Sequence, residues 1–314
     1  MATVRIGTRA SALARWQTDH VIALWREREP RLEVAIVDLT TEGDDLPEAP
    51  LEAMEGIGFF TSSIERALLE CRIDIAVHSY KDLPVAETKG LTVAAIPSRA
   101  PVEDALCARD GLTLAGLPSG ASVGTSSVRR TAQLRALRAD LDYRPLRGNV
   151  PTRLTRVASG ELAAVVLARA GLERLGLADR ITEVFPVSSV LPAPAQGALA
   201  LQARAADDML ARRLAVLDHA GTRRAVATER AVLHMLRGGC AVPVGALARI
   251  EGPNVAVAAG VVAPEGDRSV RVRVVGTSPE RTGAEAARQL LARGAGEILS
   301  SLERVPRIAG GVQA

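Results

Sequence analysis

Aromatic residues are scarce in this chain of 314 residues. Phenylalanine, tryptophan and tyrosine together make up 2% of it, although 47% of the residues are hydrophobic. The core must therefore be built from alanine, valine, leucine and isoleucine. Stacking of bases on aromatic side chains, which supports the binding of single-stranded nucleic acid, is disfavoured. A chain of this length usually forms about two domains, with three as the next option.

Cysteine is scarce as well. Cys71, Cys107 and Cys240 are too few and too widely spaced for a disulfide framework or a zinc ribbon. We expect Cys71, at the end of a predicted helix over 59–71, and Cys107 to lie inside apolar elements. Cys240 follows two glycines just beyond a helix, which predicts an exposed and available thiol or, in the plainer interpretation, an unreactive loop cysteine. The histidines lack metal-ligand spacing, so we expect no metal site.

The sequence shows no secretory signal and no membrane span. The N-terminus enters a predicted strand directly at residues 4–6, without the charged and apolar regions of a signal peptide. No uninterrupted apolar run approaches the roughly 18 to 20 residues that cross a bilayer. Together with the few cysteines, this predicts a cytoplasmic protein without a membrane partner.

Lysine is nearly absent, and arginine takes its place. The 39 basic residues include only Lys81 and Lys89, so 39 − 2 = 37 are arginines. Guanidinium groups pair bidentately with carboxylates and phosphates, which favours an anionic ligand. The net charge of +3 is too small an excess to indicate a nucleic-acid partner. A phosphate-binding Gly-x-x-x-x-Gly-Lys-Ser/Thr pattern is absent, so carboxylates are the favoured anions.

Strand and helix patterns alternate over residues 4–96, where Ser11 is expected to cap a helix over 12–28, and again over 122–167, beginning with a predicted strand at 122–124. Proline-rich segments at 97–101 and 191–197 separate the two stretches, and we expect a helical segment after 197 to pack back on the first one. From residue 221 the pattern changes to a helix, three strands that alternate like an antiparallel sheet, and a last helix.

These patterns predict an α/β fold with two βα domains and a small α+β C-terminal domain. We expect domain 1 to comprise 1–97 and 198–216, domain 2 to comprise 102–192, and domain 3 to comprise 220–306.

Residues 77–84, Val-His-Ser-Tyr-Lys-Asp-Leu-Pro, place four polar or amphipathic side chains at the end of a predicted strand over 73–77. In open α/β sheets, ligands bind outside the carboxyl ends of strands, so Ser79, Lys81 and Asp82 are candidates for binding one small molecule. A turn with a solvated Lys–Asp pair is the alternative, because adjacent opposite charges are common and contribute little.

Two strand-to-helix turns, residues 125–130 and 147–153, combine a helix start with arginines. Free backbone N–H groups at a helix N-terminus hold anions, so two such turns suggest a ligand with several negative charges. Ordinary helix capping beside exposed arginines is the alternative for either turn alone.

Taken together, these stretches resemble the porphobilinogen deaminase, or hydroxymethylbilane synthase, family. The resemblance runs almost from end to end. It is carried by residues 5–11 (Arg-Ile-Gly-Thr-Arg-Ala-Ser), 41–44 (Thr-Glu-Gly-Asp), 78–84, 123–130, 146–150 (Leu-Arg-Gly-Asn-Val), 192–197 (Pro-Ala-Pro-Ala-Gln-Gly) and 238–243 (Gly-Gly-Cys-Ala-Val-Pro).

The resemblance implies two domains like those of periplasmic binding proteins, flanking a cleft, and a third domain. It implies that Cys240 holds a dipyrromethane cofactor through a thioether. The enzyme would join four porphobilinogen units to this primer with loss of ammonia, and release linear hydroxymethylbilane by hydrolysis. The partners are then porphobilinogen and the growing polypyrrole chain, and we expect a monomer.

The resemblance also implies roles for individual residues. Asp82 would be the catalytic carboxylate, because loss of ammonia and pyrrole attack both develop positive charge that a carboxylate stabilises. Arginines would bind the acetate and propionate groups, Lys81 would bind cofactor carboxylates, and Phe60 would pack against a ring. The binding set comprises Arg9, Ser11, Gln17, Phe60, Ser79, Lys81, Thr125, Ser127, Arg129, Arg130, Arg147, Gly148, Arg153, Arg174 and Gln196.

The chain departs from the family pattern at several positions outside Asp82 and Cys240. Ile57 stands where a loop lysine is frequent, Ala195 and Pro151 where glycine is frequent, and Ala10 and Ala12 where glycine and proline are usual. A non-catalytic two-lobed protein that binds an anionic solute is the competing interpretation. A transferase or hydrolase with a cysteine nucleophile and no prosthetic group is a third.

Overall fold

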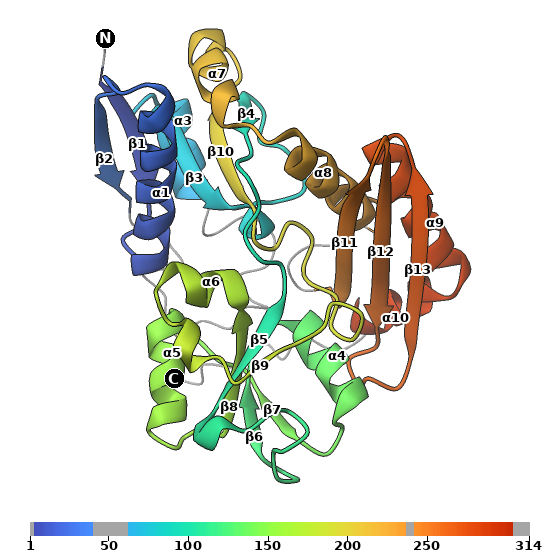
Figure 1. Cartoon of the computed structure of the whole chain (residues 1–314). Helices are drawn as coiled ribbons and strands as arrows, with labels where there is room; N and C mark the ends of the chain where they lie inside the picture. The colour runs from blue at the N-terminus through green and yellow to red at the C-terminus, as the bar shows by residue number, and fades with distance from the viewer. Residues whose placement is uncertain (1–2, 40–61, 237–241, 304–314) are drawn as a thin grey trace, which may run out of the picture.

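The computed structural model describes residues 3–39, 62–236 and 242–303. They form two α/β lobes, each around one mixed sheet, and a smaller unit with a three-stranded antiparallel sheet (Figure 1). Within the described ranges, no helix combines the length and hydrophobicity of a transmembrane span.

Lobe 1 contains the sheet β2-β1-β3-β10-β4, in which β1, β2 and β3 are parallel and β10 is antiparallel to its neighbours β3 and β4. The strands are β1 (Val4–Thr8), β2 (Val34–Asp38), β3 (Ile75–Ser79), β4 (Leu91–Ala95) and β10 (Leu199–Arg204). The central strand β3 is buried through its first four residues, as expected for a strand whose sheet is covered on both faces.

Lobe 2 repeats this arrangement in the sheet β7-β6-β8-β5-β9. Here β6, β7 and β8 are parallel, and β5 is antiparallel to β8 and pairs with β9 on its other side. The strands are β5 (Asp104–Ala108), β6 (Ser122–Gly124), β7 (Asp142–Arg144), β8 (Ala164–Ala168) and β9 (Glu183–Val184).

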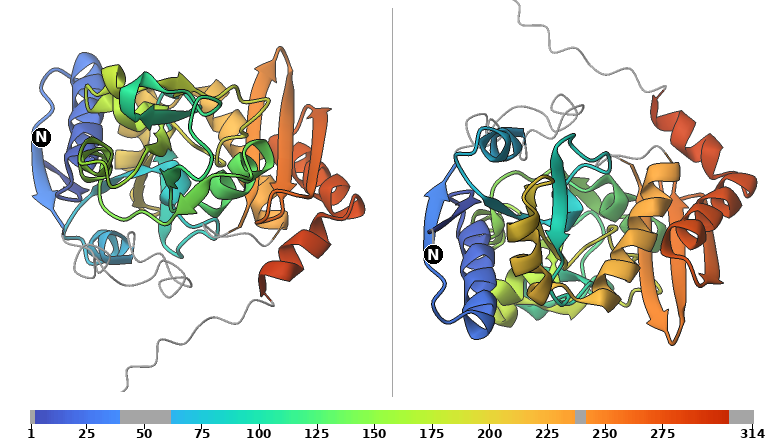
Figure 2. Two further views of the ribbon diagram at one scale, coloured as in Figure 1. Left: turned by 90° about the horizontal axis from the view of Figure 1, so that it is seen from below. Right: turned by 90° about the horizontal axis from the view of Figure 1, so that it is seen from above.

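The third unit pairs β11 (Val244–Glu251), β12 (Asn254–Val262) and β13 (Ser269–Gly276) as an antiparallel meander. Helices α8 (Ala220–Met235) and α9 (Pro279–Ala292) pack against this sheet, and their apolar faces share one core with it (Figures 1 and 2). The small side chains of this core allow close packing: Gly283 of α9 lies directly against the backbone of Thr228 in α8.

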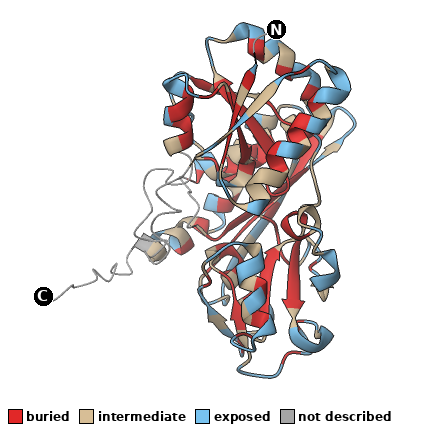
Figure 3. Ribbon diagram, turned by 90° about the vertical axis from the view of Figure 1, so that its left-hand side faces the viewer, coloured by how far each residue is buried: buried red, intermediate tan, exposed pale blue. Residues whose placement is uncertain are grey.

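Helices cover the sheets, so that buried residues concentrate in the sheet layers of both lobes (Figure 3). The α-helices are α1 (Ala12–Arg28), α3 (Ser62–Leu69), α4 (Val128–Leu137), α5 (Val150–Ala158), α6 (Arg169–Arg174), α7 (Asp208–Leu214), α8 (Ala220–Met235), α9 (Pro279–Ala292) and α10 (Ala295–Glu303). Short 3₁₀ turns are η2 (Tyr80–Asp82), η3 (Arg109–Gly111), η4 (Ala178–Arg180) and η5 (Ala215–Leu217).

Two crossover segments join the lobes, and the second one returns the chain to the sheet of lobe 1. The chain leaves lobe 1 through residues 96–103, forms β5 at once, and returns through residues 185–198 to form β10. The crossovers touch, since the Ala100 N–H donates to the carbonyl of Gly197 at 3.2 Å. Gly197 has φ +84°, and a Cβ there would lie 2.5 Å from the Ala100 carbonyl oxygen, so only glycine fits.

Several sequence-based expectations are confirmed by these elements. Helix α1 has the predicted bounds, and the Ser11 side chain caps it by accepting from the Ala14 N–H at 3.3 Å. The strand at 122–124 is also found as predicted.

Other expectations are wrong. The segment after residue 197 returns first as the strand β10, because its apolar residues pair with β3 and β4 inside the sheet. Cys71 is exposed and does not lie inside an apolar element, because α3 ends at Leu69 and Cys71 takes a positive φ of 55° in the following turn. Cys107 is buried in β5, as predicted.

Candidate active site at the junction of the lobes

The polar residues of the 77–84 motif lie where β3 ends. The strand reaches Ser79, two residues beyond the predicted end, and η2 follows directly. Asp82 ends this turn and is exposed, whereas Lys81 is half-buried. We refer to residues 79–85 as the Lys81–Asp82 turn.

Gln196 connects this turn to lobe 2. The Lys81 Nζ donates to Gln196 Oε1 at 3.3 Å, and the fully buried Gln196 donates from Nε2 to Asp104 Oδ1 at 2.9 Å and to the Val102 carbonyl at 2.8 Å. Burial lowers the pKa of Lys81 to about 8, against the attraction of the neighbouring Asp82 carboxylate. The lysine charge is therefore poorly solvated.

Asp104, the first residue of β5, pairs with two arginines of α4. Arg129 donates to Asp104 Oδ2 at 2.8 Å and to the carbonyl of Leu191 at 2.6 Å. Arg130 donates twice to Asp104 Oδ1, at 2.7 and 2.9 Å. Asp104 is fully buried, and the two guanidinium groups hold the pKa of its carboxyl far below the usual range despite that burial.

The turn between β6 and α4 contains Thr125 and Ser127. The Thr125 hydroxyl accepts from the Ser127 N–H at 3.3 Å, and the Ser127 side chain caps α4 by accepting from the Arg130 N–H at 3.4 Å. The capping interpretation thus holds for one donor of this helix start, while both arginines of the turn reach the buried Asp104.

The turn between β7 and α5 contains Arg147, Gly148 and Arg153. Gly148 has φ +98°, a conformation that favours glycine, and its carbonyl accepts from Arg153 Nε at 2.8 Å. Asn149 caps the helix by accepting from the Thr152 N–H. This bond holds the helix start in place beside the arginines.

Arg153 links the charges of the two lobes. Burial lowers its pKa to about 10; repulsion from Arg130 and Arg147 adds to this shift, and attraction by Asp82 opposes it. Asp82 in lobe 1 therefore lies within the electrostatic reach of the arginines of lobe 2.

Arg174 joins the lobes near α1. It donates to the carbonyl of Gly197 at 2.8 Å, and its guanidinium carbon lies 5.7 Å from the centre of the Trp16 ring. Burial lowers its pKa to about 10. The structure thus brings Arg174 to the crossover residue that follows Gln196.

The predicted residues of lobe 1 also lie near the end of β3. The buried Gln17 of α1 donates from Nε2 to the hydroxyl of Ser79 at 2.8 Å. Ser11 caps α1, and Arg9 is half-buried in the turn between β1 and α1. Phe60, Ile57 and Cys240 lie outside the described residues.

Sequence reasoning missed two buried carboxylates that support this site. Asp104 opens a short apolar run right after the proline-rich segment, a placement that could have marked it as a paired buried charge. Glu229 of α8 is fully buried and binds Arg99 bidentately at 2.7 and 2.9 Å, while it accepts from the Ala195 N–H. Its sequence position in a helix carries no such signal.

The site combines one exposed carboxylate with cations from both lobes. Such a set can bind several carboxylate groups while the carboxylate of Asp82 stabilises positive charge or moves a proton. Within the described ranges, no group of three or more His, Cys, Asp or Glu residues could hold a metal ion.

Two family models match the chain. "Porphobilinogen deaminase, dipyromethane cofactor binding domain" matches residues 4–212, and "Porphobilinogen deaminase, C-terminal domain" matches residues 223–292. The chain is 44% identical over 300 residues to a porphobilinogen deaminase of Acidithiobacillus ferrooxidans, covering 96% of this chain and 98% of the relative. It is 46% identical over 299 residues to one of Desulforudis audaxviator, covering 95% and 97%.

Solved structures of other proteins also match the chain in part. A periplasmic substrate-binding protein of an ABC transporter from Coxiella burnetii matches with a TM-score of 0.44 and 12% identity, over 73% of this chain and 97% of that one. The aliphatic sulphonate binding protein SsuA of Escherichia coli matches with a TM-score of 0.38 and 16% identity, over 75% and 70%.

Proposed function

Because the chain belongs to the porphobilinogen deaminase family, we propose that Asp82 is its catalytic carboxylate and that Cys240 carries the dipyrromethane cofactor through a thioether. The activity is that of a transferase, hydroxymethylbilane synthase, acting on porphobilinogen. This family assignment does not favour a non-catalytic solute-binding protein.

The observation that carries the role of Asp82 is its position between cations of both lobes. Lys81 directly precedes Asp82 in the chain, and attraction by the Asp82 carboxylate acts on the pKa of Arg153 in lobe 2. As ammonia leaves porphobilinogen, positive charge develops on the substrate, and the Asp82 carboxylate stabilises it and then takes up the departing pyrrole proton.

The donor set fits a polycarboxylate cofactor and substrate. Each pyrrole carries an acetate and a propionate, and burial lowers the pKa of Lys81, Arg153 and Arg174, so their charges gain stability from carboxylate partners. When bound, dipyrromethane supplies the primer to which porphobilinogen is joined. Lys81 would hold its carboxylates, and the remaining binding residues would hold the substrate and the growing polypyrrole chain.

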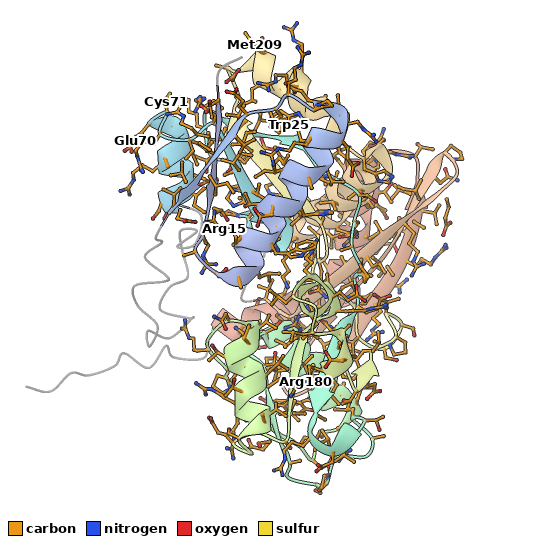
Figure 4. All side chains as sticks on the ribbon, turned by 60° about the vertical axis from the view of Figure 1, so that its left-hand side comes forward. Arg15, Trp25, Glu70, Cys71, Arg180 and Met209 are labelled. Carbon is orange, nitrogen blue, oxygen red and sulfur yellow. The ribbon has the colours of Figure 1, made fainter. Side chains whose placement is uncertain are left out.

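The positions of the other thiols support Cys240 as the attachment residue. Burial raises the pKa of the Cys107 thiol to about 12, which keeps it protonated and unreactive. Cys71 is exposed at the outer end of lobe 1, away from the junction of the lobes (Figure 4).

Intact mass tests the attachment. The purified protein should be heavier than its sequence by one dipyrromethane, Cys240→Ser should lose this increment, and the control Cys71→Ser should keep it. An unmodified mass in active protein, or retention of the increment in Cys240→Ser, would contradict the proposal.

The proposal includes three domains: 1–97 with 198–216, 102–192, and 220–306. Strand membership supports these limits, because β10 joins the sheet of lobe 1 while β5 to β9 form that of lobe 2. We also propose a cytoplasmic monomer without a nucleic-acid or membrane partner. Two cysteines that remain free thiols, Cys71 and Cys107, support a reducing compartment.

A further inference from the structure

Arg230 of α8 reaches from the third unit to the Lys81–Asp82 turn. Its Nη1 donates to the carbonyl of Leu83 at 3.1 Å, and its Nη2 donates to the carbonyls of Pro84 and Val85 at 2.6 and 3.4 Å. Three consecutive carbonyl groups just after Asp82 thus converge on one guanidinium fork. A single planar group with several donors can fix the path of a turn in this way.

The same guanidinium covers the residue before Lys81. Its carbon lies 4.5 Å from the centre of the Tyr80 ring, and Tyr80 is 8% exposed. The backbone N–H of Tyr80 donates to the carbonyl of Ala198 at 3.0 Å, so the turn is held from the crossover side as well. Arg230 therefore contacts the chain on both sides of Lys81 and Asp82.

The neighbouring residue of α8 holds the other segment that touches Lys81. Glu229 accepts from the Ala195 N–H at 2.7 Å, from Ala248 N–H at 2.8 Å and twice from Arg99. Ala195 precedes Gln196, the residue that accepts from Lys81. Two consecutive residues of α8 thus hold the turn that contains Lys81 and the segment to which Lys81 donates.

We propose that Arg230 is a positioning residue that sets the Lys81–Asp82 turn in register with the helix leading to Cys240. Helix α8 ends at Met235, five residues before Cys240 in the chain (240 − 235). The hydrogen bonds of Arg230 tie the position of the turn, and with it the Asp82 carboxylate, to α8. This inference rests on the proposed roles of Asp82 and Cys240.

Arg223 of the same helix provides a matched control. It also spans from α8 to lobe 1, but its hydrogen bonds go to the carbonyls of Val93 and Ala94 in β4 and to Asp218, whereas those of Arg230 go to the turn. Loss of Arg223 weakens the same interface by the same kind of bond. A purely structural role for Arg230 predicts equal effects of Arg230→Met and Arg223→Met.

Steady-state kinetics on the cofactor-loaded protein separate the two roles. We expect Arg230→Met to lower kcat by roughly 10- to 100-fold, because small misplacements of a catalytic group cost up to about 10²-fold. KM should change by less than about twofold if substrate binding is kept. Intact mass should show normal cofactor loading, and Arg223→Met should retain kcat within about twofold of the unmodified protein, as expected for a contact that positions no reacting group.

A conservative variant and a double variant sharpen the result. Arg230→Lys keeps the charge without the planar fork, and we expect a loss of kcat intermediate between those of the unmodified protein and Arg230→Met. If Arg230→Met fails to fold, the kcat of Arg230→Lys tests the proposal instead. The double variant Arg230→Met/Asp82→Asn should be no slower than Asp82→Asn alone, since Arg230 acts through the turn.

Equal losses of kcat in Arg230→Met and Arg223→Met, or additive losses in the double variant, would overturn the proposal. A slow Asp82→Asn beside a normal Arg230→Met would remove Arg230 and leave the assignment of Asp82 intact. A normal Asp82→Asn would remove Asp82 as the catalytic carboxylate and, with it, the positioning role of Arg230 that rests on it.

Discussion

The sheets of the two lobes have the same strand order and directions, with β1, β2, β3, β10 and β4 of lobe 1 matching β6, β7, β8, β5 and β9 of lobe 2. In lobe 1 the fourth strand, β10, is supplied by chain that returns from lobe 2, whereas in lobe 2 the fourth strand, β5, is the first strand of the lobe's own run. The functional groups also differ. Lobe 1 presents the exposed Asp82 after its third strand, whereas lobe 2 encloses Asp104 at the start of β5.

The two carboxylates therefore differ in what they can do. Asp82 is exposed and ends a short turn, so it can meet a ligand. Asp104 is buried and accepts hydrogen bonds from Arg129, Arg130 and Gln196, so its negative charge is already paired within the protein. A shared architecture can therefore hold one carboxylate ready for reaction and another to orient cations, because burial and pairing decide what each can do.

The largest expected effect is on turnover by the carboxylate of lobe 1. We expect Asp82→Asn to lower kcat by roughly 10²- to 10⁴-fold, because the amide cannot stabilise positive charge or accept a proton. The midpoint of urea unfolding should hardly change, since Asp82 is exposed. Asp142→Asn, on an exposed strand of lobe 2, is the control and should keep normal turnover; near-normal turnover of Asp82→Asn would refute its role.

The carboxylate of lobe 2 should show the opposite pattern. Asp104→Asn leaves two buried arginines without their partner and should lower the free energy of unfolding by about 3–5 kcal/mol, measured by urea denaturation. The depressed pKa of Asp104 adds a pH dependence: its stabilisation is present above the unfolded-state pKa of 3.8 and is lost as pH falls below it. An unchanged free energy of unfolding in Asp104→Asn would contradict the supporting role of Asp104 in lobe 2.

A smaller effect concerns the titration of Lys81. With only two lysines in the chain, ¹³C-labelled lysine gives two NMR signals, and Lys81→Arg identifies one of them. In Cys240→Ser, without cofactor, we expect Lys81 to titrate near its lowered pKa of about 8. The folded-state pKa lies below the unfolded value of 10.5, so the cost of the charged lysine is present below pH 8 and is relieved as pH rises toward 10.5.

Bound carboxylates should raise this pKa, because they favour the charged form. The cofactor-loaded protein should therefore show Lys81 titrating at higher pH than Cys240→Ser does. The same titration midpoint in both proteins would exclude contact between Lys81 and cofactor carboxylates.

The smallest effect compares matching helix ends. Helix α3 of lobe 1 is followed after one residue by Cys71 at φ 55°, whereas α5 of lobe 2 is followed after one residue by Gly160 at φ 84°. Glycine adopts this left-handed conformation without strain. We expect Cys71→Gly to raise the free energy of unfolding by about 0.5 kcal/mol and Gly160→Ala to lower it by about 1 kcal/mol. A destabilised Cys71→Gly would show that the cysteine side chain contributes packing at this turn.

Much of the local structure follows from the sequence. Ser11 predicts the start of α1, the Gly-Thr-Ser-Ser turn predicts the start of α4, and the 77–84 motif predicts polar groups at a strand end. Periodicity and caps act within one or two turns of chain, so they can be recognised without the fold. The family resemblance adds the activity, since it depends on the order of several motifs.

The tertiary structure alone decided which residues work together. Asp104 meets Arg129 across 25 residues and Gln196 across 92, and Arg230 meets Pro84 across 146. The return of the chain from lobe 2 places β10 between β3 and β4, a position that the strand preceding it in the sequence does not predict. Sequence patterns determine the elements and the chemistry they carry. Packing determines which charges are buried and paired, because desolvation and long-range contacts exist only in the folded chain.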